Sequence, residues 1–231
     1  MSKKVAYVTG GMGGIGTAIC QRLHKDGFTV IAGCGPTRDY DKWLAEQKAL
    51  GFTFHASVGN VADWNSTVEA FSKAKAEHGP IDVLVNNAGI TRDRMFLKMT
   101  REDWDAVIDT NLNSMFNVTK QVVPDMVERG WGRIVQISSV NGEKGQAGQT
   151  NYSASKAGVV GMTRTWALEL AHQRSLDDRA FLATAGITTL NALDGLAIKP
   201  PLVQHDPLPF DETQIDEDAA RIAQHILEGA S

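Results

Sequence analysis

The chain has 231 residues, of which 42% are hydrophobic and 22% charged, and its formal net charge is −4. This composition is typical of a globular protein with a sizeable core, and the length suits one α/β domain. The negative charge argues against general electrostatic attraction to nucleic acid or to an anionic membrane. No apolar run reaches the roughly 20 residues that a membrane-spanning helix needs.

The first residues and the cysteines indicate a cytoplasmic protein. The sequence MSKKVAYVTGG has too short an apolar run before its glycines for a signal peptide. Cys20 and Cys34 cannot form a disulfide framework, and their spacing matches no zinc motif. We therefore expect two buried free thiols in a reducing compartment, and no metal site.

Short apolar segments alternate with longer amphipathic ones. Segments rich in valine and isoleucine predict buried strands at 4–9, 29–34, 52–57, 82–87 and 132–138. Helical periodicity predicts helices at about 15–26, 39–50, 64–78 and 101–129, the last broken near TNLNS at 110–114. This alternation predicts an α/β fold with a Rossmann-type doubly wound parallel sheet in three αβα layers. We expect a single domain over residues 1–231.

A glycine-rich turn, TGGMGGIG at 9–16, lies between the first predicted strand and the first predicted helix. Glycine allows a tight turn, close approach of the backbone to a pyrophosphate and close packing of helix on strand. The N-terminus of the helix presents free N–H groups and a partial positive charge. The combination favours nucleotide binding over a purely structural turn. The predicted cofactor-binding residues of this turn are Gly10, Met12, Gly13, Gly14, Ile15 and Gly16.

The spacing of these glycines differs from the G-x-G-x-x-G fingerprint. It resembles the T-G-x-x-x-G-x-G pattern of the short-chain dehydrogenase/reductase family, and further marks of this family follow in order. They are NNAG at 86–89, Asn111, and a serine thirteen residues before a Tyr-x-x-x-Lys motif at 152–156. The resemblance implies a Rossmann-type fold, a nicotinamide cofactor and a homo-oligomer, usually a dimer or tetramer.

Within this family, residues 4–170 are similar to the NADPH-dependent acetoacetyl-CoA reductases of polyhydroxybutyrate synthesis, as in MTREDWDAVIDTNL at 99–112. The resemblance implies reduction of a 3-oxoacyl thioester, with acetoacetyl-CoA as the favoured substrate. Two alternatives stay open: reduction of 3-oxoacyl chains on acyl carrier protein, and nucleotide binding without turnover.

The residues after the second strand discriminate between NAD and NADP, because they face the adenosine ribose. A carboxylate there accepts a bond from a free 2′-hydroxyl and repels a 2′-phosphate. Here Cys34 and Gly35 stand in its place, and Arg38 follows with donors that suit a phosphate. NADPH is therefore favoured over NAD. Arg38 as a solvated loop charge is the alternative, and Asp39 and Asp41 weaken the local positive field.

The resemblance adds cofactor residues on two further loops. Gly59, Asn60 and Val61 follow the third strand; Asn60 and Val61 are expected to flank the adenine, with Asn60 where many relatives carry aspartate. Those expected to contact the cofactor through their backbone follow the fourth strand: Asn87, Ala88 and Gly89. This is the carboxyl edge, where ligands bind in open α/β sheets. A structural turn is the alternative for the second loop.

Tyr152 and Lys156 are four residues apart on a predicted helix and project from one face. Carbonyl reduction needs a hydride on carbon and a proton on oxygen. Tyrosine has a reference pKa near 10, and a nearby ammonium lowers that pKa by favouring the phenolate. We therefore predict Tyr152 as the acid and Lys156 as its tuner. By resemblance both also belong to the cofactor site, Lys156 through the nicotinamide ribose.

Ser139 ends the fifth predicted strand, where its hydroxyl can hold a substrate carbonyl and the developing oxyanion. Ser138 precedes it, so one of the two points the other way along the strand. The thirteen-residue step to Tyr152 favours Ser139 by resemblance. Asn111, at the predicted break between helices, resembles the residue that holds a proton-relay water behind the lysine.

The loop VNGEKGQAGQT at 140–150 joins the predicted serine to the predicted tyrosine, and we expect it to line the substrate side. The amides of Gln146 and Gln149 suit a thioester or β-keto oxygen, with solvated loop side chains as the alternative. Asp93 and Lys98 are expected at the rim, where Lys98 would meet a coenzyme A phosphate.

The last quarter, residues 172–231, departs from the family. GITTLNALDGLAIKP at 186–200 is similar to the segment of the sixth strand and the turn after it. Residues 200–214 are rich in proline and predict a loop, and residues 215–231 predict an amphipathic helix capped by Asp216. The family's last strand is expected to be missing, which would leave an open sheet edge and alter a usual subunit contact.

Overall fold

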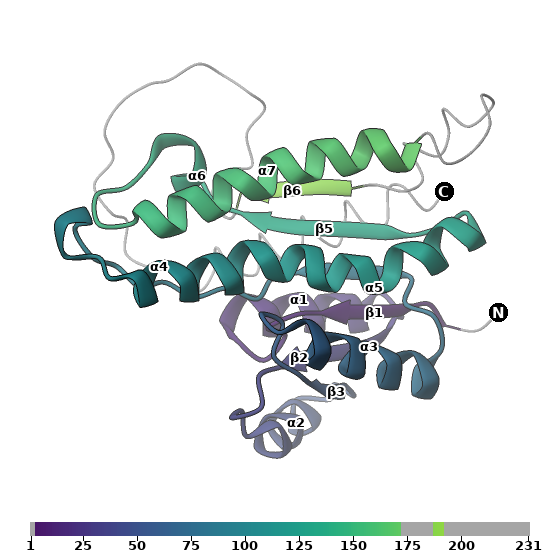
Figure 1. Cartoon of the computed structure of the whole chain (residues 1–231). Coiled ribbons are helices and arrows are strands. Elements are labelled where there is room, and N and C mark those ends of the chain that lie inside the picture. Colours follow the sequence, from purple (N-terminus) through teal and green to yellow (C-terminus); the bar gives the residue numbers. More distant parts are fainter. Residues whose placement is uncertain (1–2, 172–186, 192–231) are drawn as a thin grey trace.

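Six parallel strands form one sheet in the order β3-β2-β1-β4-β5-β6 (Figure 1). The computed structural model describes residues 3–171 and 187–191. The strands are β1 (Val5–Val8), β2 (Thr29–Cys34), β3 (His55–Val58), β4 (Val83–Asn86), β5 (Arg133–Ser138) and β6 (Ile187–Asn191). The strand order reverses between β1 and β4, which makes their carboxyl ends the topological switch point. The predicted Rossmann-type doubly wound sheet is confirmed.

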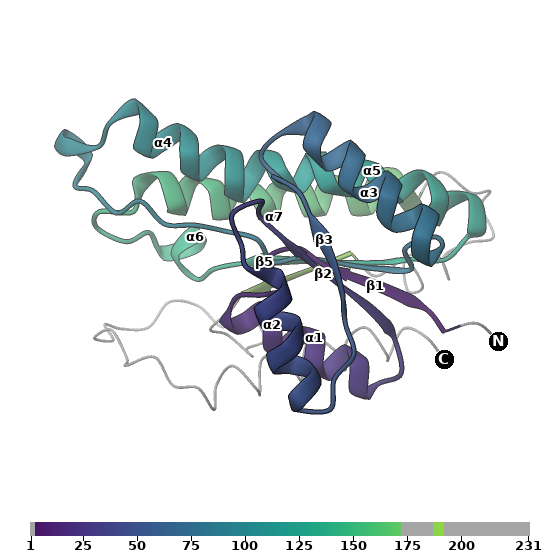
Figure 2. The same cartoon turned by 90° about the horizontal axis from the view of Figure 1, so that it is seen from below.

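Helices cover both faces of the sheet, as the three-layer prediction requires. In Figure 2, α1 (Gly14–Lys25) and α2 (Tyr40–Ala49) lie on one face. The helices on the other face are α3 (Trp64–His78), α4 (Arg101–Ile108), α5 (Ser114–Arg129) and α7 (Thr150–Ala171). Two short helices, η1 (Phe96–Lys98) and α6 (Asn141–Lys144), lie in the loops after β4 and β5.

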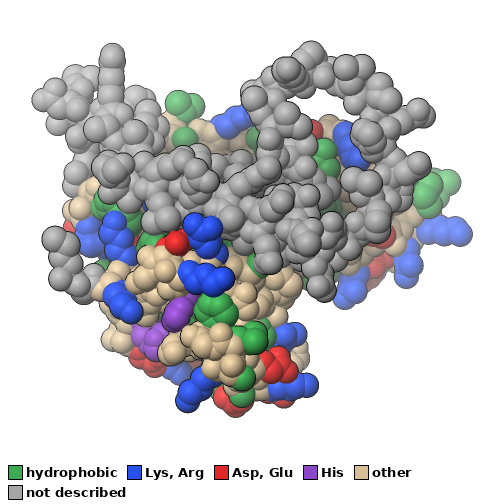
Figure 3. Space-filling model, turned by 180° about the vertical axis from the view of Figure 1, so that it is seen from behind, with side chains coloured by type: hydrophobic (Ala, Val, Ile, Leu, Met, Phe, Trp, Pro, Cys, Tyr) green, Lys and Arg blue, Asp and Glu red, His purple; other side chains and the backbone are tan. Residues whose placement is uncertain are grey.

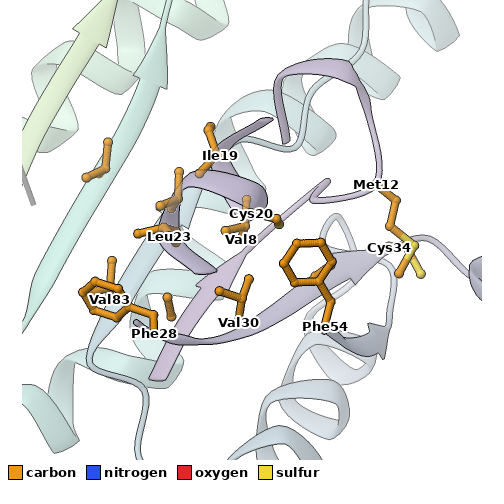
Figure 4. Close-up of a cluster of buried hydrophobic side chains, with 14 of the residues drawn as sticks. Val8, Met12, Ile19, Cys20, Leu23, Phe28, Val30, Cys34, Phe54 and Val83 are labelled. Atoms are coloured by element: carbon orange, nitrogen blue, oxygen red, sulfur yellow. The ribbon is translucent and has the colours of Figure 1, made fainter. Parts of the chain in front are cut away.

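The two faces of the sheet bury separate hydrophobic clusters. Alternate residues of β1 divide between them, because successive side chains of a strand point to opposite faces. Val8 packs with Ile19 and Leu23 of α1 in the cluster of Figure 4, whereas Tyr7 packs with Phe71 of α3 in the other cluster. Strands buried on both faces read as continuous apolar runs, which is why they were predictable.

Both cysteines are buried free thiols, as expected. Cys20 lies inside the cluster of Figure 4, and Cys34 lies beside Met12 at its edge. Both signs of charge are present on the described part of the surface in Figure 3, in keeping with the small net charge. Of the helices that the structure describes, none has the length and apolar character needed to cross a membrane.

The predicted helix at 101–129 is interrupted at the expected place. α4 ends at Ile108, a π-helical turn η2 (Asp109–Asn113) follows, and α5 begins at Ser114. Single π-helical turns inside α-helices frequently mark functional sites. The turn includes Asn111, so the break brings a predicted site residue into the interior of the molecule.

Two strands, β3 and β6, can be compared with their predicted positions. β3 begins at His55 rather than at residue 52, because its pairing with β2 starts at His55, opposite Ile31. β6 confirms the sixth strand expected within 186–200. The predicted loop at 200–214 and the predicted helix at 215–231, with its Asp216 cap, lie outside the described residues.

Candidate active site

The glycine loop joins β1 to α1 at the switch point. The physical reason for glycine differs from one position of the loop to the next. Gly10 has a φ of +61°, and a Cβ there would lie 3.0 Å from the Cα of Ala88. A Cβ on Gly16 would collide with the carbonyl oxygen of Gly10, so only glycine lets α1 pack against the loop. A Cβ on Gly14 would meet nothing within 4 Å. The loop is therefore tight against the protein on one side and open on the other.

The N-terminus of α1 is arranged to receive an anion. Its N-cap residue, Gly13, makes no side-chain capping bond, and the first turn carries no acidic residue. The first N–H groups of the helix are therefore left for another partner, and the helix dipole favours a negative charge there. This fits the diphosphate of a nicotinamide dinucleotide, which the glycine motif predicted.

Two adjoining clefts extend from this loop along the carboxyl edge of the sheet. The first, of about 440 Å³, contains eleven predicted cofactor residues: Gly10, Met12, Gly13, Gly14, Ile15, Gly16, Gly35, Arg38, Asn87, Ala88 and Gly89. The second, of about 260 Å³, contains the predicted cofactor residues Gly59, Asn60 and Val61. Motifs from four separate loops thus line one continuous surface.

Arg38 lies at the mouth of the first cleft. Its Nη2 donates to the carbonyl oxygen of Met12 at 2.8 Å, which places the guanidinium over the glycine loop. Asp39 is turned to α2, where its side chain caps the helix by accepting from the N–H of Lys42. Of the described residues that line either cleft, none is acidic and Arg38 is the one with a full charge. This environment suits an additional phosphate.

Thr9 joins the two halves of the sheet at the switch point. Its Oγ1 accepts from the N–H groups of Asn87 and Ala88 at 2.9 and 3.0 Å. Asn87 Nδ2 returns two bonds, to the carbonyl oxygens of Thr9 and Gly10 at 3.1 and 3.2 Å. Thr9 was not among the predicted site residues, although it begins the motif that was recognised. These bonds hold the glycine loop and the NNAG loop together as one wall.

Two aromatic side chains that were not predicted as site residues form the floor of the second cleft, where the adenine is expected. The rings of Tyr7 and Phe71 stack at 4.2 Å, and both line the cleft. Burial raises the pKa of Tyr7 to about 12. A Cβ on Gly33 would lie 2.9 Å from the Tyr7 ring, so this strand residue must be glycine for the floor to form. Asn60 uses its Oδ1 locally, accepting from the N–H of Ala62 at 3.2 Å.

The two serines at the end of β5 point in different directions, as predicted. Ser138 Oγ donates to the backbone oxygen of Lys156 at 3.0 Å and so faces α7. Ser139 Oγ accepts from the N–H of Asn141 at 3.2 Å, and contact with the Ser139 side chain lowers the pKa of Tyr152. The structure therefore pairs Tyr152 with Ser139, the serine chosen by spacing.

Tyr152 and Lys156 lie on the same face of α7, with Lys156 Nζ 5.7 Å from the centre of the tyrosine ring. Lys156 is buried, donates to the backbone oxygen of Ile137 at 2.7 Å, and has its pKa lowered to about 8 by burial. The pKa of Tyr152 is raised overall, by its burial above all; contact with Ser139 lowers it and the charge of Asp93 raises it. This direction differs from the predicted lowering, because desolvation outweighs a lysine held on Ile137. A raised pKa keeps the phenol protonated, as a proton donor requires.

Asn111 is fully buried and uses both polar atoms of its side chain on one residue. Its Nδ2 donates to the carbonyl oxygen of Ile90 at 2.9 Å, and its Oδ1 accepts from the N–H of Ile90 at 2.8 Å. It lies next to Lys156, since a Cβ on Gly89 would contact Asn111 Oδ1 at 3.4 Å and Lys156 Nζ at 3.9 Å. The side chain thus fixes the π-helical turn to the NNAG loop, and its predicted water-holding role stays a prediction.

Of the predicted substrate residues, Asp93 and Gln149 are hydrogen-bonded to each other, whereas Gln146 and Lys98 are not part of this pair. Gln149 Nε2 donates to Asp93 Oδ2 at 2.9 Å, and Gln149 Oε1 accepts from Asn141 Nδ2 at 2.9 Å. Gln146 and Lys98 are exposed. The structure therefore brings Asp93 and Gln149 together near Tyr152, with Asp93 itself exposed, and it leaves the side chains of Gln146 and Lys98 at the surface without this contact.

Asn151 is a site residue that sequence reasoning missed. It is fully buried, and its Nδ2 donates to the carbonyl oxygens of Arg92 and Asp103 at 3.1 and 3.0 Å. Its Oδ1 accepts from the N–H of Tyr152 at 2.8 Å. An asparagine at the start of a helix directly before the tyrosine was the available signal.

A parallel sheet with a glycine loop at its switch point, and a serine–tyrosine–lysine set beside it, define a nicotinamide-dependent oxidoreductase with a Rossmann-type fold. The chain belongs to the short chain dehydrogenase family, whose sequence model matches residues 4–175. It is 70% identical over 172 residues to an acetoacetyl-CoA reductase of Cupriavidus necator, covering 74% of this chain and 70% of that protein.

Two further comparisons extend this similarity. A 3-oxoacyl-acyl-carrier-protein reductase of Thermotoga maritima is 49% identical over 168 residues, covering 73% of this chain and 68% of that protein. The crystal structure of a variant actinorhodin polyketide ketoreductase with NADPH is similar with a TM-score of 0.70 and 38% identity. That match covers 74% of this chain and 66% of the ketoreductase chain.

Proposed function

We propose that this oxidoreductase uses NADPH to reduce a 3-oxoacyl thioester, with acetoacetyl-CoA as the preferred substrate, to the 3-hydroxyacyl form. The observation that carries the proposal is the grouping of Ser139, Tyr152 and Lys156 beside a cleft whose charged lining residue is Arg38. The acetoacetyl-CoA reductase at 70% identity supports the substrate class. The NADPH of the similar ketoreductase structure supports the cofactor.

The residues that would hold the cofactor fit its chemistry. The open N-terminus of α1 suits the diphosphate, Arg38 suits the 2′-phosphate, and the stacked rings of Tyr7 and Phe71 offer an apolar floor for the adenine. Lys156 is the residue we assign to the nicotinamide ribose. When bound, the nicotinamide supplies the hydride that reaches the carbonyl carbon.

The proton chemistry falls to the chain's own residues. Ser139 donates a hydrogen bond to the substrate carbonyl oxygen and stabilises the negative charge that develops there. Tyr152 gives its phenolic proton to that oxygen, which becomes the 3-hydroxyl group, and the phenolate formed is stabilised by the nearby Lys156. We propose that Asn111 holds a water behind Lys156, through which the phenolate of Tyr152 regains its proton.

The first test is oxidation of NADPH by the purified chain, with and without acetoacetyl-CoA. Oxidation that depends on the substrate supports the proposal. Tyr152→Phe keeps the ring but removes the proton, so turnover is expected to fall by about 10²- to 10⁴-fold with cofactor binding unchanged. Undiminished turnover in that variant would contradict the assigned acid.

A 3-oxoacyl chain on acyl carrier protein is the second candidate, favoured by the 49% identical relative of that name. Comparing kcat/KM for acetoacetyl-CoA and for acetoacetyl-acyl-carrier-protein decides between them, and a higher value for the carrier-bound substrate would overturn our preference. Stable NADPH binding without reduction of either thioester would identify a nucleotide-binding protein without turnover.

We further propose a cytoplasmic homo-oligomer in polyhydroxybutyrate synthesis, as the resemblance to the reductases of that pathway implies. Light scattering after size-exclusion chromatography tests the assembly, and a monomer at micromolar concentration would contradict it. Rescue of polymer accumulation in cells lacking their own reductase tests the pathway.

A further inference from the structure

Three consecutive residues, 92–94, are hydrogen-bonded to the segment 148–151 that directly precedes Tyr152. The two outer contacts use backbone atoms of the loop. The carbonyl oxygen of Arg92 accepts from Asn151 Nδ2 at 3.1 Å, and the N–H of Arg94 donates to the carbonyl oxygen of Gly148 at 2.8 Å. The central contact uses a side chain, since Asp93 Oδ2 accepts from Gln149 Nε2 at 2.9 Å. Asp93 is therefore the loop residue whose side chain joins the two segments.

This contact continues inward to the reacting hydroxyls. Gln149 Oε1 accepts from Asn141 Nδ2 at 2.9 Å, and the backbone N–H of Asn141 donates to Ser139 Oγ at 3.2 Å. The side chain of Ser139 in turn lowers the pKa of Tyr152 by its contact with the phenol. Hydrogen bonds to Gln149 and Asn141 thus connect the Asp93 carboxylate to the Ser139 hydroxyl, which lies beside Tyr152.

The carboxylate gives these hydrogen bonds a direction. An ionised carboxylate only accepts hydrogen bonds, so Gln149 must present its NH₂ group to Asp93 and its oxygen to Asn141. The carboxylate thereby fixes the side chain of Asn141, whose backbone N–H donates to Ser139 Oγ and leaves the hydrogen of that serine to be donated elsewhere. An amide in place of the carboxylate would accept either orientation of Gln149, so the contact that holds the Asn141 side chain would no longer be fixed.

We infer that Asp93 is a positioning residue, which orients the hydroxyls of Ser139 and Tyr152 through Gln149 and Asn141. The inference rests on the proposed reduction, in which these two hydroxyls meet the substrate carbonyl. It gives Gln149 a role within the protein, in place of the predicted bond from its amide to the substrate.

The charges around Tyr152 predict how the pH dependence responds. Asp93 raises the pKa of Tyr152, and Lys156 of α7 is the buried cation on the other side. Arg94, the next residue of the loop, is directed to Asp103 at 3.7 Å. Removing the Asp93 charge therefore lowers the pKa of Tyr152, and the fall in reduction rate at high pH begins at a lower pH.

The test compares Asp93→Asn with Asp105→Asn in steady-state turnover across pH. Asp105 loses the same charge in the control, but its carboxylate binds Arg101 on α4. We expect Asp93→Asn to lower kcat about tenfold, the loss of one charge-assisted bond, with KM changed less than about twofold and the basic limb shifted to lower pH. The control should match the unmodified protein. A higher KM with unchanged kcat and pH profile would make Asp93 a substrate contact and overturn the inference.

A second comparison asks whether Asp93 acts through Gln149. In a Gln149→Leu background, Asp93→Asn should cost less than about twofold further in kcat, because residues that act in one chain are not additive. Losses that multiply would show that Asp93 acts independently, and the inference would be wrong.

A readout without turnover separates this inference from the proposed function. The chain has three tyrosines, so the absorbance titration of Tyr152 is obtained as the difference from Tyr152→Phe. Asp93→Asn should lower the pKa of Tyr152, whereas Asp105→Asn should not. If the unmodified protein reduces no thioester but this shift is seen, the proposed function fails and the positioning role stands. If no shift is seen, the positioning role fails.

Discussion

The ammonium group of Lys156 donates to the backbone oxygen of Ile137 at 2.7 Å, and this bond connects α7 to the end of β5. The lysine is buried, and burial lowers its pKa from 10.5 to about 8. A charged group held in the interior by one carbonyl is costly, so this contact serves the site at the expense of stability.

Replacing Lys156 by methionine should change how stability depends on pH. Between about pH 8 and 10.5 the unfolded chain binds the lysine proton and the folded chain does not, so the free energy of unfolding rises with pH in this range. The rise contributed by this residue can reach about 3 kcal/mol. Lys156→Met should remove it. Urea denaturation at several pH values measures the slope, and an unchanged slope would show that the lysine is not the group responsible.

Two glycine substitutions in the same loop should separate folding from cofactor binding. Gly16→Ala forces a Cβ into the carbonyl of Gly10, and we expect it to lower the free energy of unfolding by about 3 kcal/mol or more. Gly14→Ala meets no protein atom, so stability should change by less than about 1 kcal/mol while NADPH affinity falls. Denaturant melts and cofactor fluorescence titration give the two readouts. Equal destabilisation by both variants would contradict the loop geometry.

Arg38→Gln tests the preference for NADPH. A charge-assisted bond to the 2′-phosphate is worth roughly 10- to 100-fold in affinity, and NADH has no such phosphate. The dissociation constant for NADPH should therefore rise by that factor, with the value for NADH nearly unchanged. Lys42→Gln, which removes an exposed charge from the first turn of α2, is the matched control. Equal weakening of both cofactors would show that Arg38 does not read the phosphate.

Asn111→Asp should destabilise the molecule and inactivate it together. The substitution turns the donor that faces the Ile90 carbonyl into an oxygen inside a fully buried site. We expect a loss of about 3 kcal/mol in the free energy of unfolding, because a buried acceptor then faces another acceptor. Asn65→Asp, at an exposed position of α3, should have little effect. Full activity and stability in Asn111→Asp would refute the anchoring role of this side chain.

The sequence by itself determined the features that depend on neighbours along the chain. Apolar runs, helical periods and the glycine spacing at 9–16 are local, so they revealed the strands, the phosphate loop and the break at 110–114. Only the tertiary structure decided which distant groups meet. It paired Gln149 with Asp93 across 56 residues and Asn111 with Ile90 across 21. It also reversed the expected shift in the pKa of Tyr152, because desolvation depends on everything packed around a side chain and not on the lysine one turn away.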